Sequence, residues 1–290
     1  MPLGPSELIL NADGSIYHLH LIPEDLANTI ITVGDPNRVA KVSSYFDTLE
    51  IIKANREFTT HTGILSGNRI TVVSTGIGTD NIDIVLNELD ALVNIDFGSR
   101  EVKHDKKQLD IVRIGTAGAI QPQIPVDSFL TSEYALGFDN LMHFYLSDAI
   151  QNPEVQEAFI AHMQWSQHKS TPYFVECDRV LAQKFKSHTM LSGLTATNVG
   201  FYGPQGRTLR LKPQDEQLNS KLTSFNHKGL QIANLEMETS GIYGLSKLLG
   251  HRAVSLNCIL ANRSTGEFSK DPDKAVDGLI RYALEKLTGV

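Results

Sequence analysis

The sequence has few cysteines, no long apolar run and no surplus of basic residues, and each of these absences excludes a class of protein. Its 290 residues include two cysteines, Cys177 and Cys258, which lie far apart and form no CxxC pair. A disulfide framework and a cysteine-based zinc site are therefore not expected. No apolar run approaches the roughly 18 residues of a membrane-spanning helix. The 26 Lys and Arg are outnumbered by 33 Asp and Glu, which gives a net charge of −7, whereas nucleic-acid binders usually carry a basic surplus.

Several catalytic and targeting motifs are also missing. The sequence contains no GxxxxGK[ST] loop for nucleoside triphosphates, no HExxH zinc motif and no GxSxG nucleophile turn. His162 and His168 are six residues apart rather than four, and no metal site is predicted. The first 30 residues have neither the basic start nor the apolar stretch of a secretory signal. We expect a soluble, cytoplasmic protein that binds neither nucleic acid nor a membrane.

Short apolar runs alternate with longer segments of helical periodicity. Six runs are typical of strands covered on both faces, and they span residues 29–33, 69–75, 111–115, 190–193, 232–235 and 253–260. Helices are expected at three places: after Asp80, with Thr79 or Asp80 as the N-cap; after Glu238, ending at Gly250; and from Asp271-Pro272 to Gly289. Strands that alternate with helices in this way predict an α/β layer fold.

The chain carries no obvious domain boundary. It contains no Pro/Ser-rich linker, no repeat and no low-complexity tract, so one domain over residues 1–290 is preferred, although the length alone would favour about two. The charged segment 99–110 is interpreted as a solvated excursion from the core. A second polar stretch, residues 204–228, is long enough to be a lid or a helical flap.

Two strand ends carry glycines together with an arginine. VGDPNR (33–38) places Arg38 just beyond a Gly-Asp-Pro turn, and VRIGTAG (112–118) ends in two glycines around Thr116. Each segment could be an ordinary tight turn between a strand and a helix. Glycines also allow backbone amides to approach an anion, and arginine matches phosphate oxygens. Arg113 favours this second interpretation, because an arginine in an apolar strand is very costly unless it meets an anion.

Two further segments could contact a sugar or a base. In LEMETS (235–240), Glu236 and Glu238 flank Met237 where a strand meets a helix. The carboxylates could simply cap the helix, or one could bind sugar hydroxyls while Met237 packs on the ribose. In FYGPQGR (201–207), Gln205 and Arg207 could bind the edge of an amide-like heterocycle. A solvated loop would explain the same residues nearly as well.

Taken together, seven segments resemble the nucleoside phosphorylase family of trimeric or hexameric habit, and within it the uridine phosphorylase branch. They follow the family's order over nearly the whole chain, as GDPNR (34–38), REFTT (56–60), STGIG (74–78), RIGTAGAIQP (113–122), FYGPQGR (201–207), LEMET (235–239) and ANRST (261–265). The resemblance implies a single α/β domain with a central mixed, partly barrel-like sheet flanked by helices. It also implies phosphorolysis of uridine to uracil and ribose 1-phosphate.

The resemblance assigns roles to individual residues. Catalysis is assigned to Arg207, Glu238 and Arg113. The implied phosphate site consists of Gly34, Arg38, Arg113 and Thr116, with Arg56 reaching in from a neighbouring subunit. The implied ribose contacts are Met237 and Glu238, with Glu236 beside them. The resemblance also implies that His18 of a neighbouring subunit contacts the 5′-hydroxyl. The implied base pocket consists of Phe201, Gln205, Arg207 and the supporting Arg263.

Purine specificity is the nearest alternative. Purine-cleaving relatives carry an aspartate just after the last core strand, where this sequence has Ala261-Asn262-Arg263. Without that acid to protonate a purine nitrogen, the chain falls on the pyrimidine side. A purine nucleoside phosphorylase or a nucleosidase of the same superfamily remains open, and a nucleoside-binding protein without turnover has less support.

The resemblance implies no cofactor, since inorganic phosphate is a co-substrate. Some bacterial members hold potassium at a subunit interface through residues that match Glu57, Ile77 and a serine. Asn81 replaces that serine here, so this ion is not carried over. The implied assembly is a homo-oligomer, at least a dimer and, as in bacterial-type members, a hexamer built of three dimers.

Overall fold

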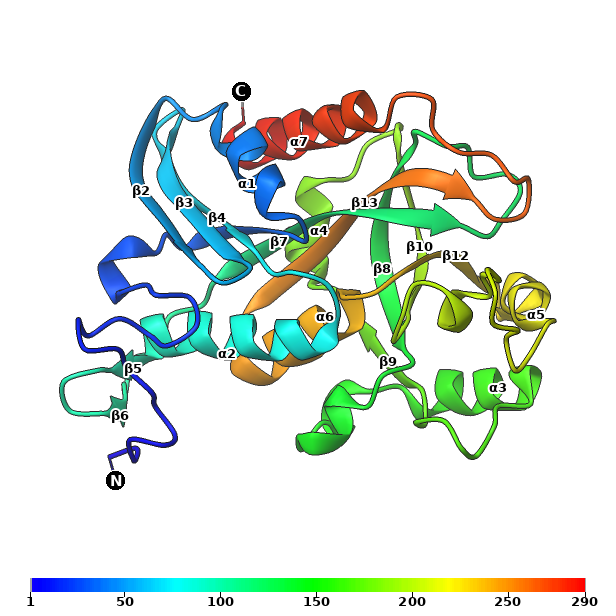
Figure 1. Ribbon diagram of the computed structural model, residues 1–290, viewed down its shortest axis with the longest axis horizontal. Coiled ribbons are helices and arrows are strands. Elements are labelled where there is room, and N and C mark those ends of the chain that lie inside the picture. Colours follow the sequence, from blue (N-terminus) through cyan, green and yellow to red (C-terminus); the bar gives the residue numbers. More distant parts are fainter. Residues whose placement is uncertain (1, 290) are drawn as a thin grey trace.

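One mixed sheet runs through the computed structural model, which describes residues 2–289 (Figure 1). Within that range the sheet has eleven strands in the order β11-β12-β10-β8-β13-β7-β1-β4-β3-β2, with β9 paired to β8. The strands are β1 (Thr29–Val33), β2 (Thr48–Asn55), β3 (Phe58–Leu65), β4 (Asn68–Ser74), β7 (Asp110–Ala119), β8 (Phe129–Gly137), β9 (Tyr173–Glu176), β10 (Met190–Thr197), β11 (Asn226–His227), β12 (Leu230–Glu236) and β13 (Arg252–Asn262). A separate hairpin consists of β5 (Ile95–Asp96) and β6 (Glu101–Val102).

Helices cover the sheet on both faces. Those in the described range are α1 (Pro36–Ser43), α2 (Thr79–Asn94), α3 (Pro153–Met163), α4 (Arg179–Lys184), α5 (Leu218–Ser224), α6 (Thr239–Leu249) and α7 (Pro272–Thr288). One core cluster joins Ile82 of α2 and Ile242 of α6 to Ile30 of β1. Another joins Val39 of α1 and Leu279 of α7 to the opposite face of the sheet. Figure 1 shows the same layers, with α2 and α6 on one side and α1 and α7 on the other.

Part of the sheet closes into a ring. β12 pairs with β10 and also, antiparallel, with β7, where Asn234 lies opposite Ala119 and Leu235 opposite Gly118. The strands β7, β13, β8, β10 and β12 therefore enclose a barrel, while β1, β4, β3 and β2 continue outward from β7. The prediction of a single α/β domain with a mixed, partly barrel-like sheet is confirmed.

All six predicted strands are present in the structure. β1 has the predicted bounds, whereas β7 extends to Ala119 and β10 to Thr197. Their residues are mostly buried, as expected for strands that are covered on both faces. The helix ends predicted from caps are also confirmed for α6 and α7. Asp271 accepts a hydrogen bond from Lys274 N at 3.2 Å, and the left-handed Gly250 and Gly289 close the two helices.

The predicted N-cap of α2 is wrong. The cap is Gly78, in place of Thr79 or Asp80. Gly78 has a φ of 99°, a conformation that L residues rarely adopt. Its N–H donates to Glu238 Oε1 at 2.8 Å, so a carboxylate from a distant segment occupies the start of this helix.

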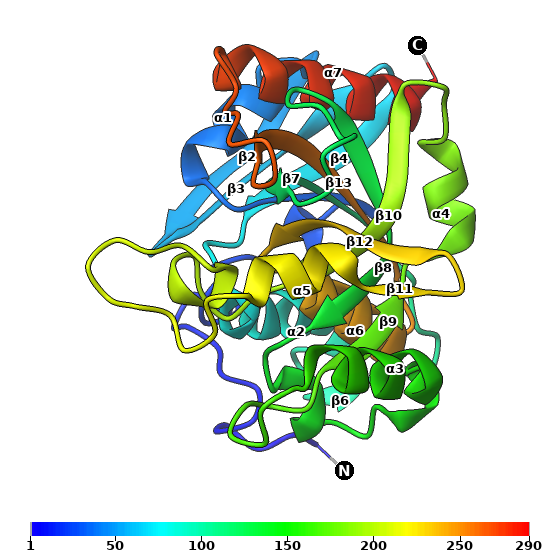
Figure 2. The same ribbon diagram turned by 90° about the vertical axis from the view of Figure 1, so that its right-hand side faces the viewer.

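The two polar stretches differ in the structure. Residues 99–108 of the predicted excursion 99–110 are mostly exposed, as expected. The excursion ends there, because Leu109 is buried and Asp110 begins β7. In the stretch 204–228, Leu218 and Leu222 of α5 are buried against the barrel, so this half is no flap. The preceding residues 207–217 form a loop that extends from the body (Figure 2). Within the described chain, no helix combines the length and the apolar character needed to cross a membrane.

Candidate active site

One cavity of about 700 Å³ is lined by residues from several strand ends. They come from the segments that follow β1 and β12, from β7 and from the end of β13. This volume is within the usual range for small-molecule sites. Ten residues predicted from the sequence line it together, namely Gly34, Arg38, Arg113, Thr116, Phe201, Gln205, Arg207, Glu236, Met237 and Glu238. Residues that are remote in the sequence are thus brought to a single site.

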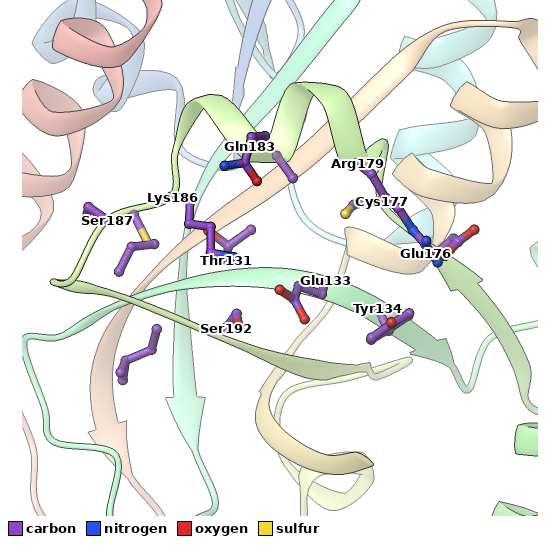
Figure 3. A pocket seen from close by; sticks show the side chains of 13 residues that line it. Thr131, Glu133, Tyr134, Glu176, Cys177, Arg179, Gln183, Lys186, Ser187 and Ser192 are labelled. Carbon is purple, nitrogen blue, oxygen red and sulfur yellow. Dashed lines mark hydrogen bonds and ion pairs between the residues drawn. The ribbon is translucent and has the colours of Figure 1, made fainter. Parts of the chain in front are cut away.

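A smaller cavity of about 280 Å³ lies between α4 and the strands β8 and β10 (Figure 3). Gln183 and Lys186 from the α4 segment face Glu133 of β8 across it. Its lining includes none of the residues predicted from the sequence. The cavity of about 700 Å³, where ten predicted residues meet, is therefore the candidate active site.

One group of residues in the wall of this cavity, named the cationic end, consists of Gly34, Arg38, Arg113 and Thr116. Arg38 lies in the first turn of α1 and donates through Nη1 to Ile114 O at 3.4 Å. Burial, and then repulsion by Arg113, lowers the pKa of Arg38. An anion between the two guanidinium groups would relieve that repulsion.

Two carboxylates compensate the charge of Arg113. Its Nη2 donates to Glu238 Oε2 at 2.6 Å and lies 3.2 Å from Glu236 Oε2. Burial opposes the charge on Arg113, but Glu236 and Glu238 outweigh it and raise the pKa of the guanidinium. The pKa of Glu238 is raised by burial, which outweighs the attraction of Arg113. The three groups form one buried ionic cluster in which each charge has a partner.

The two glutamates have different partners. Glu236 Oε2 accepts hydrogen bonds at 2.9 Å from the backbone N–H groups of Glu238 and Thr239 and from the Thr239 hydroxyl, and Oε1 accepts from the Thr197 hydroxyl at 2.6 Å. The capping interpretation is therefore correct for Glu236. Glu238 makes no side-chain cap bond to α6, and its carboxylate lines the cavity next to the half-buried Met237.

A second group of residues in the wall, named the aromatic end, consists of Phe201, Gln205 and Arg207. The guanidinium carbon of Arg207 lies 3.7 Å from the centre of the Phe201 ring, and Nη1 donates to Gln205 Oε1 at 2.6 Å. Burial, and then the charge of Arg263, lowers the pKa of Arg207 to about 10. Arg263 itself lies behind this end, with its stem near Gly118, and it does not line the cavity.

His18 and Arg56 lie outside the cavity of their own chain. His18 Nδ1 is 2.6 Å from Glu88 Oε1, and its carbonyl oxygen accepts from Asn55 Nδ2 at 2.8 Å. Arg56 is exposed in the turn between β2 and β3, and its guanidinium carbon is 5.5 Å from the centre of the Tyr17 ring. The structure therefore groups these two predicted residues with each other rather than with the ten that line the cavity.

The wall formed by the end of β13 and the turn after it was not predicted from the sequence. Leu260, Ala261 and Phe268 line the cavity, and Phe268 is placed by a turn that pairs it with Ala261. No spacing signal marks that turn in the sequence. Asn262 is buried in the turn, where its Nδ2 donates to Gln121 O at 2.9 Å and to Ile124 O at 2.8 Å. Among the described residues, the segments 201–207 and 260–268 line the cavity with Phe201, Gln205, Arg207, Leu260, Ala261 and Phe268. None of these six is an acid.

Comparisons with known proteins agree in one family. The model of the phosphorylase superfamily matches residues 28–286. The uridine phosphorylase of Thermococcus kodakarensis is 30% identical over 268 residues, covering 90% of this chain and 83% of that protein. A DeoD-type purine nucleoside phosphorylase of Roseobacter denitrificans is 25% identical, covering 92% and 97%. A solved Trypanosoma brucei nucleoside phosphorylase, described as showing uridine phosphorylase activity, superposes with a TM-score of 0.87 at 28% identity, covering 98% of this chain and all of that one.

We predict that Gly115→Ala displaces Arg113 and destabilises the protein. A Cβ at this position would lie 2.0 Å from Arg113 Nη1, and the guanidinium cannot move without leaving its carboxylates. The expected loss is about 1–3 kcal/mol of unfolding free energy, measured by urea denaturation. Gly203→Ala is the control, because a Cβ there meets nothing within 4 Å. Equal stability of the two variants would contradict the prediction.

Proposed function

This chain belongs to the phosphorylase superfamily, and we propose that within it the chain cleaves uridine with inorganic phosphate to give uracil and ribose 1-phosphate. The observation that carries the proposal is the set of side chains that line one cavity. Two arginines, a carboxylate next to a methionine, and a glutamine–arginine pair are brought together there. These three groups match phosphate, ribose and pyrimidine. The similarity to uridine phosphorylases over most of the chain supports the same assignment.

The cationic end is proposed to bind phosphate. Arg38 and Arg113 supply two guanidinium groups, which match phosphate oxygens in charge and in geometry. Gly34 allows close approach of the backbone, and Thr116 supplies a hydroxyl. Both positions line the cavity beside the arginines. Because the arginines repel each other, a bound anion lowers the energy of both.

The part of the cavity wall formed by Met237 and Glu238 is proposed to bind ribose. The Glu238 carboxylate accepts hydrogen bonds from the sugar hydroxyls, and Met237 packs on the apolar face of the sugar. Glu236 lies beside them and supports Arg113 and the start of α6. Holding ribose next to the phosphate converts the reaction of two molecules into a step within one complex.

The aromatic end is proposed to bind uracil. Gln205 can both donate to and accept from an amide-like ring edge, and Arg207 donates. Gln205 is only 3% exposed, and Arg207 stacks on Phe201, so both groups are held in place before substrate arrives. Arg263 is proposed to support the loop that carries Arg207, because its Nη2 donates to Gly206 O at 3.5 Å. The absence of an acid among the described lining residues 201–207 and 260–268 argues against purine cleavage, which remains the alternative.

The proposed reaction needs no acid–base pair. Phosphate attacks the anomeric carbon as the glycosidic bond lengthens and the sugar gains oxocarbenium character. A carbon–oxygen bond to phosphate forms, the carbon–nitrogen bond breaks, and its electron pair leaves with uracil. Arg207 and Gln205 then stabilise the uracil anion. Catalysis therefore consists of positioning and of electrostatic stabilisation by groups that are already in place.

We predict that uracil is released from uridine only when phosphate is present. Uridine and inosine are each incubated with the enzyme, with and without phosphate, and the bases are separated by chromatography. Inosine is expected to stay intact, because the aromatic end supplies no acid to a purine nitrogen. Cleavage of inosine would indicate a purine enzyme, and cleavage without phosphate would indicate a nucleosidase.

We predict that Glu238→Gln impairs the enzyme more on uridine than on 2′-deoxyuridine. If the carboxylate binds the 2′-hydroxyl, the ratio of kcat/KM between the substrates should shift by roughly 10- to 100-fold, as expected for a charged hydrogen bond. Glu236→Gln is the matched control. Because Glu236 caps α6, its variant should lose stability and affect both substrates equally. A parallel result for Glu238→Gln would contradict its role at the sugar.

We propose further that the active unit is a homo-oligomer, at least a dimer and by family resemblance a hexamer of three dimers. Arg56 and His18 lie near one another but outside the cavity of their own chain. This position supports the proposal that they complete the site of a neighbouring subunit. The mouth of the cavity carries exposed apolar groups that a second copy could cover, with Ile77 67% and Phe268 64% exposed. Arg56 would add a third cation to the phosphate, and His18 would bind the 5′-hydroxyl.

We predict that two inactive variants complement each other. Arg56→Ala and Arg113→Ala chains, one carrying an affinity tag, are mixed, unfolded and refolded, and the mixed oligomers are isolated through the tag. If sites are shared, each mixed dimer has one site with both lesions and one with neither, so a substantial fraction of activity returns. Mixed oligomers that stay as inactive as their parents would mean that Arg56 acts within its own chain.

A further inference from the structure

A row of buried polar side chains crosses the interior of the barrel, one from each strand. Arg113 Nη1 on β7 donates to Asn257 Oδ1 on β13 at 2.8 Å, and Asn257 Nδ2 donates to Ser132 Oγ on β8 at 2.9 Å. Ser132 is hydrogen-bonded to Thr195 on β10, whose hydroxyl donates to Asn234 Oδ1 on β12 at 2.8 Å. None of these residues is more than 6% exposed. The row connects the cationic end of the cavity to the far wall of the barrel.

Arg113 determines the orientation of the Asn257 amide in this row. A guanidinium only donates, so Asn257 must turn its oxygen toward Arg113 and its NH₂ group toward Ser132. Ser132 accepts from Asn257, and its own hydrogen goes to Thr195, because the Thr195 hydroxyl already donates to Asn234. Reversing the Asn257 amide would set donor against donor beside Arg113 and leave buried groups unsatisfied, which is costly. The amide therefore has one favourable orientation.

Strand register explains why Arg113 meets Asn257. In the parallel pair β7–β13, Arg113 is opposite Ser255 and Gly115 is opposite Asn257. The guanidinium folds over Gly115, where an added Cβ would lie 2.0 Å from Nη1, and so reaches the residue opposite Gly115. Ser255 Oγ adds a longer contact to the same nitrogen at 3.2 Å. Asn257 is thus the nearer of the two β13 groups that hold Nη1.

We infer that Asn257 is a positioning residue that keeps Arg113 in the orientation that binds phosphate. The inference rests on the proposed function, in which Arg113 is a phosphate ligand. Asn257 is not part of the cavity lining, so it acts on phosphate through Arg113. By holding Nη1 on β13, it limits rotation of the guanidinium toward Glu236 and Glu238. Without it, both carboxylates would draw Arg113 away from the position where it meets the anion.

Replacing Asn257 by leucine tests this role at similar side-chain volume. Binding of inorganic phosphate is measured by calorimetry, and the KM values for phosphate and uridine are measured separately. Asn257→Leu should weaken phosphate binding and raise the phosphate KM by about 10- to 100-fold, while the uridine KM moves by less than about threefold. A merely structural defect would lower the amount of active enzyme without separating the two KM values.

Thr32→Val is the matched control. Thr32 lies opposite Arg113 on the other neighbouring strand, β1, and is fully buried. Its hydroxyl has no hydrogen-bond partner among residues 2–289. This variant should leave phosphate binding unchanged.

If Asn257→Leu also binds phosphate like the wild type, the positioning role is overturned and the proposed function stands. If the wild type itself fails to bind phosphate, the proposed function fails and the inference with it.

Ser132→Ala decides the question if Asn257→Leu does not fold. This smaller change removes the oxygen that accepts from Asn257 Nδ2 but leaves Arg113 and Asn257 in place. Phosphate binding should weaken in the same direction by about three- to tenfold, again with little effect on the uridine KM. Unchanged phosphate binding in Ser132→Ala would overturn the inference.

Discussion

A charged arginine inside the barrel is the constraint on which the rest of the site depends. Arg113 is only 6% exposed, and a buried guanidinium is very costly unless its charge and its donors are satisfied. Glu236 and Glu238 supply the opposite charge, and Asn257 supplies an oxygen from β13. Loss of Arg113 would leave two buried carboxylates without their cation, and loss of Asn257 would remove the nearer of the two acceptors of Nη1. These side chains therefore act as one unit, although they come from three strands and the start of a helix.

The same cluster ties the helices to the sheet at the cavity. Glu236 binds Arg113 and the first N–H groups of α6, and Glu238 binds Arg113 and the N–H of Gly78 at the start of α2. Two helix starts thus meet a single buried cation on β7. The groups proposed to bind phosphate and ribose are held by backbone contacts of the core, which favours a site formed before substrate binds.

Features encoded by neighbouring residues could be predicted from the sequence, and features that depend on strand pairing could not. The apolar run of β1 predicted its bounds. The end of α6 could be predicted because Gly250 comes directly after the last apolar residues of the helix. The edge strand β2 was missed because none of its residues is buried, so it has no apolar run. Family motifs predicted ten residues that meet in one cavity. The part that Asn257 plays depends on the register between β7 and β13, which no local pattern encodes.

The central claim is tested most directly by identifying the source of the oxygen atom that becomes bonded to the sugar. That claim is that the buried arginine cluster holds phosphate, rather than water, against the anomeric carbon of uridine. The enzyme is incubated with uridine and fully ¹⁸O-labelled phosphate, and the products are identified by mass spectrometry. The account predicts ribose 1-phosphate that retains every labelled oxygen, including the one bonded to the anomeric carbon. Free ribose, or ribose 1-phosphate with an unlabelled bridging oxygen, would contradict it.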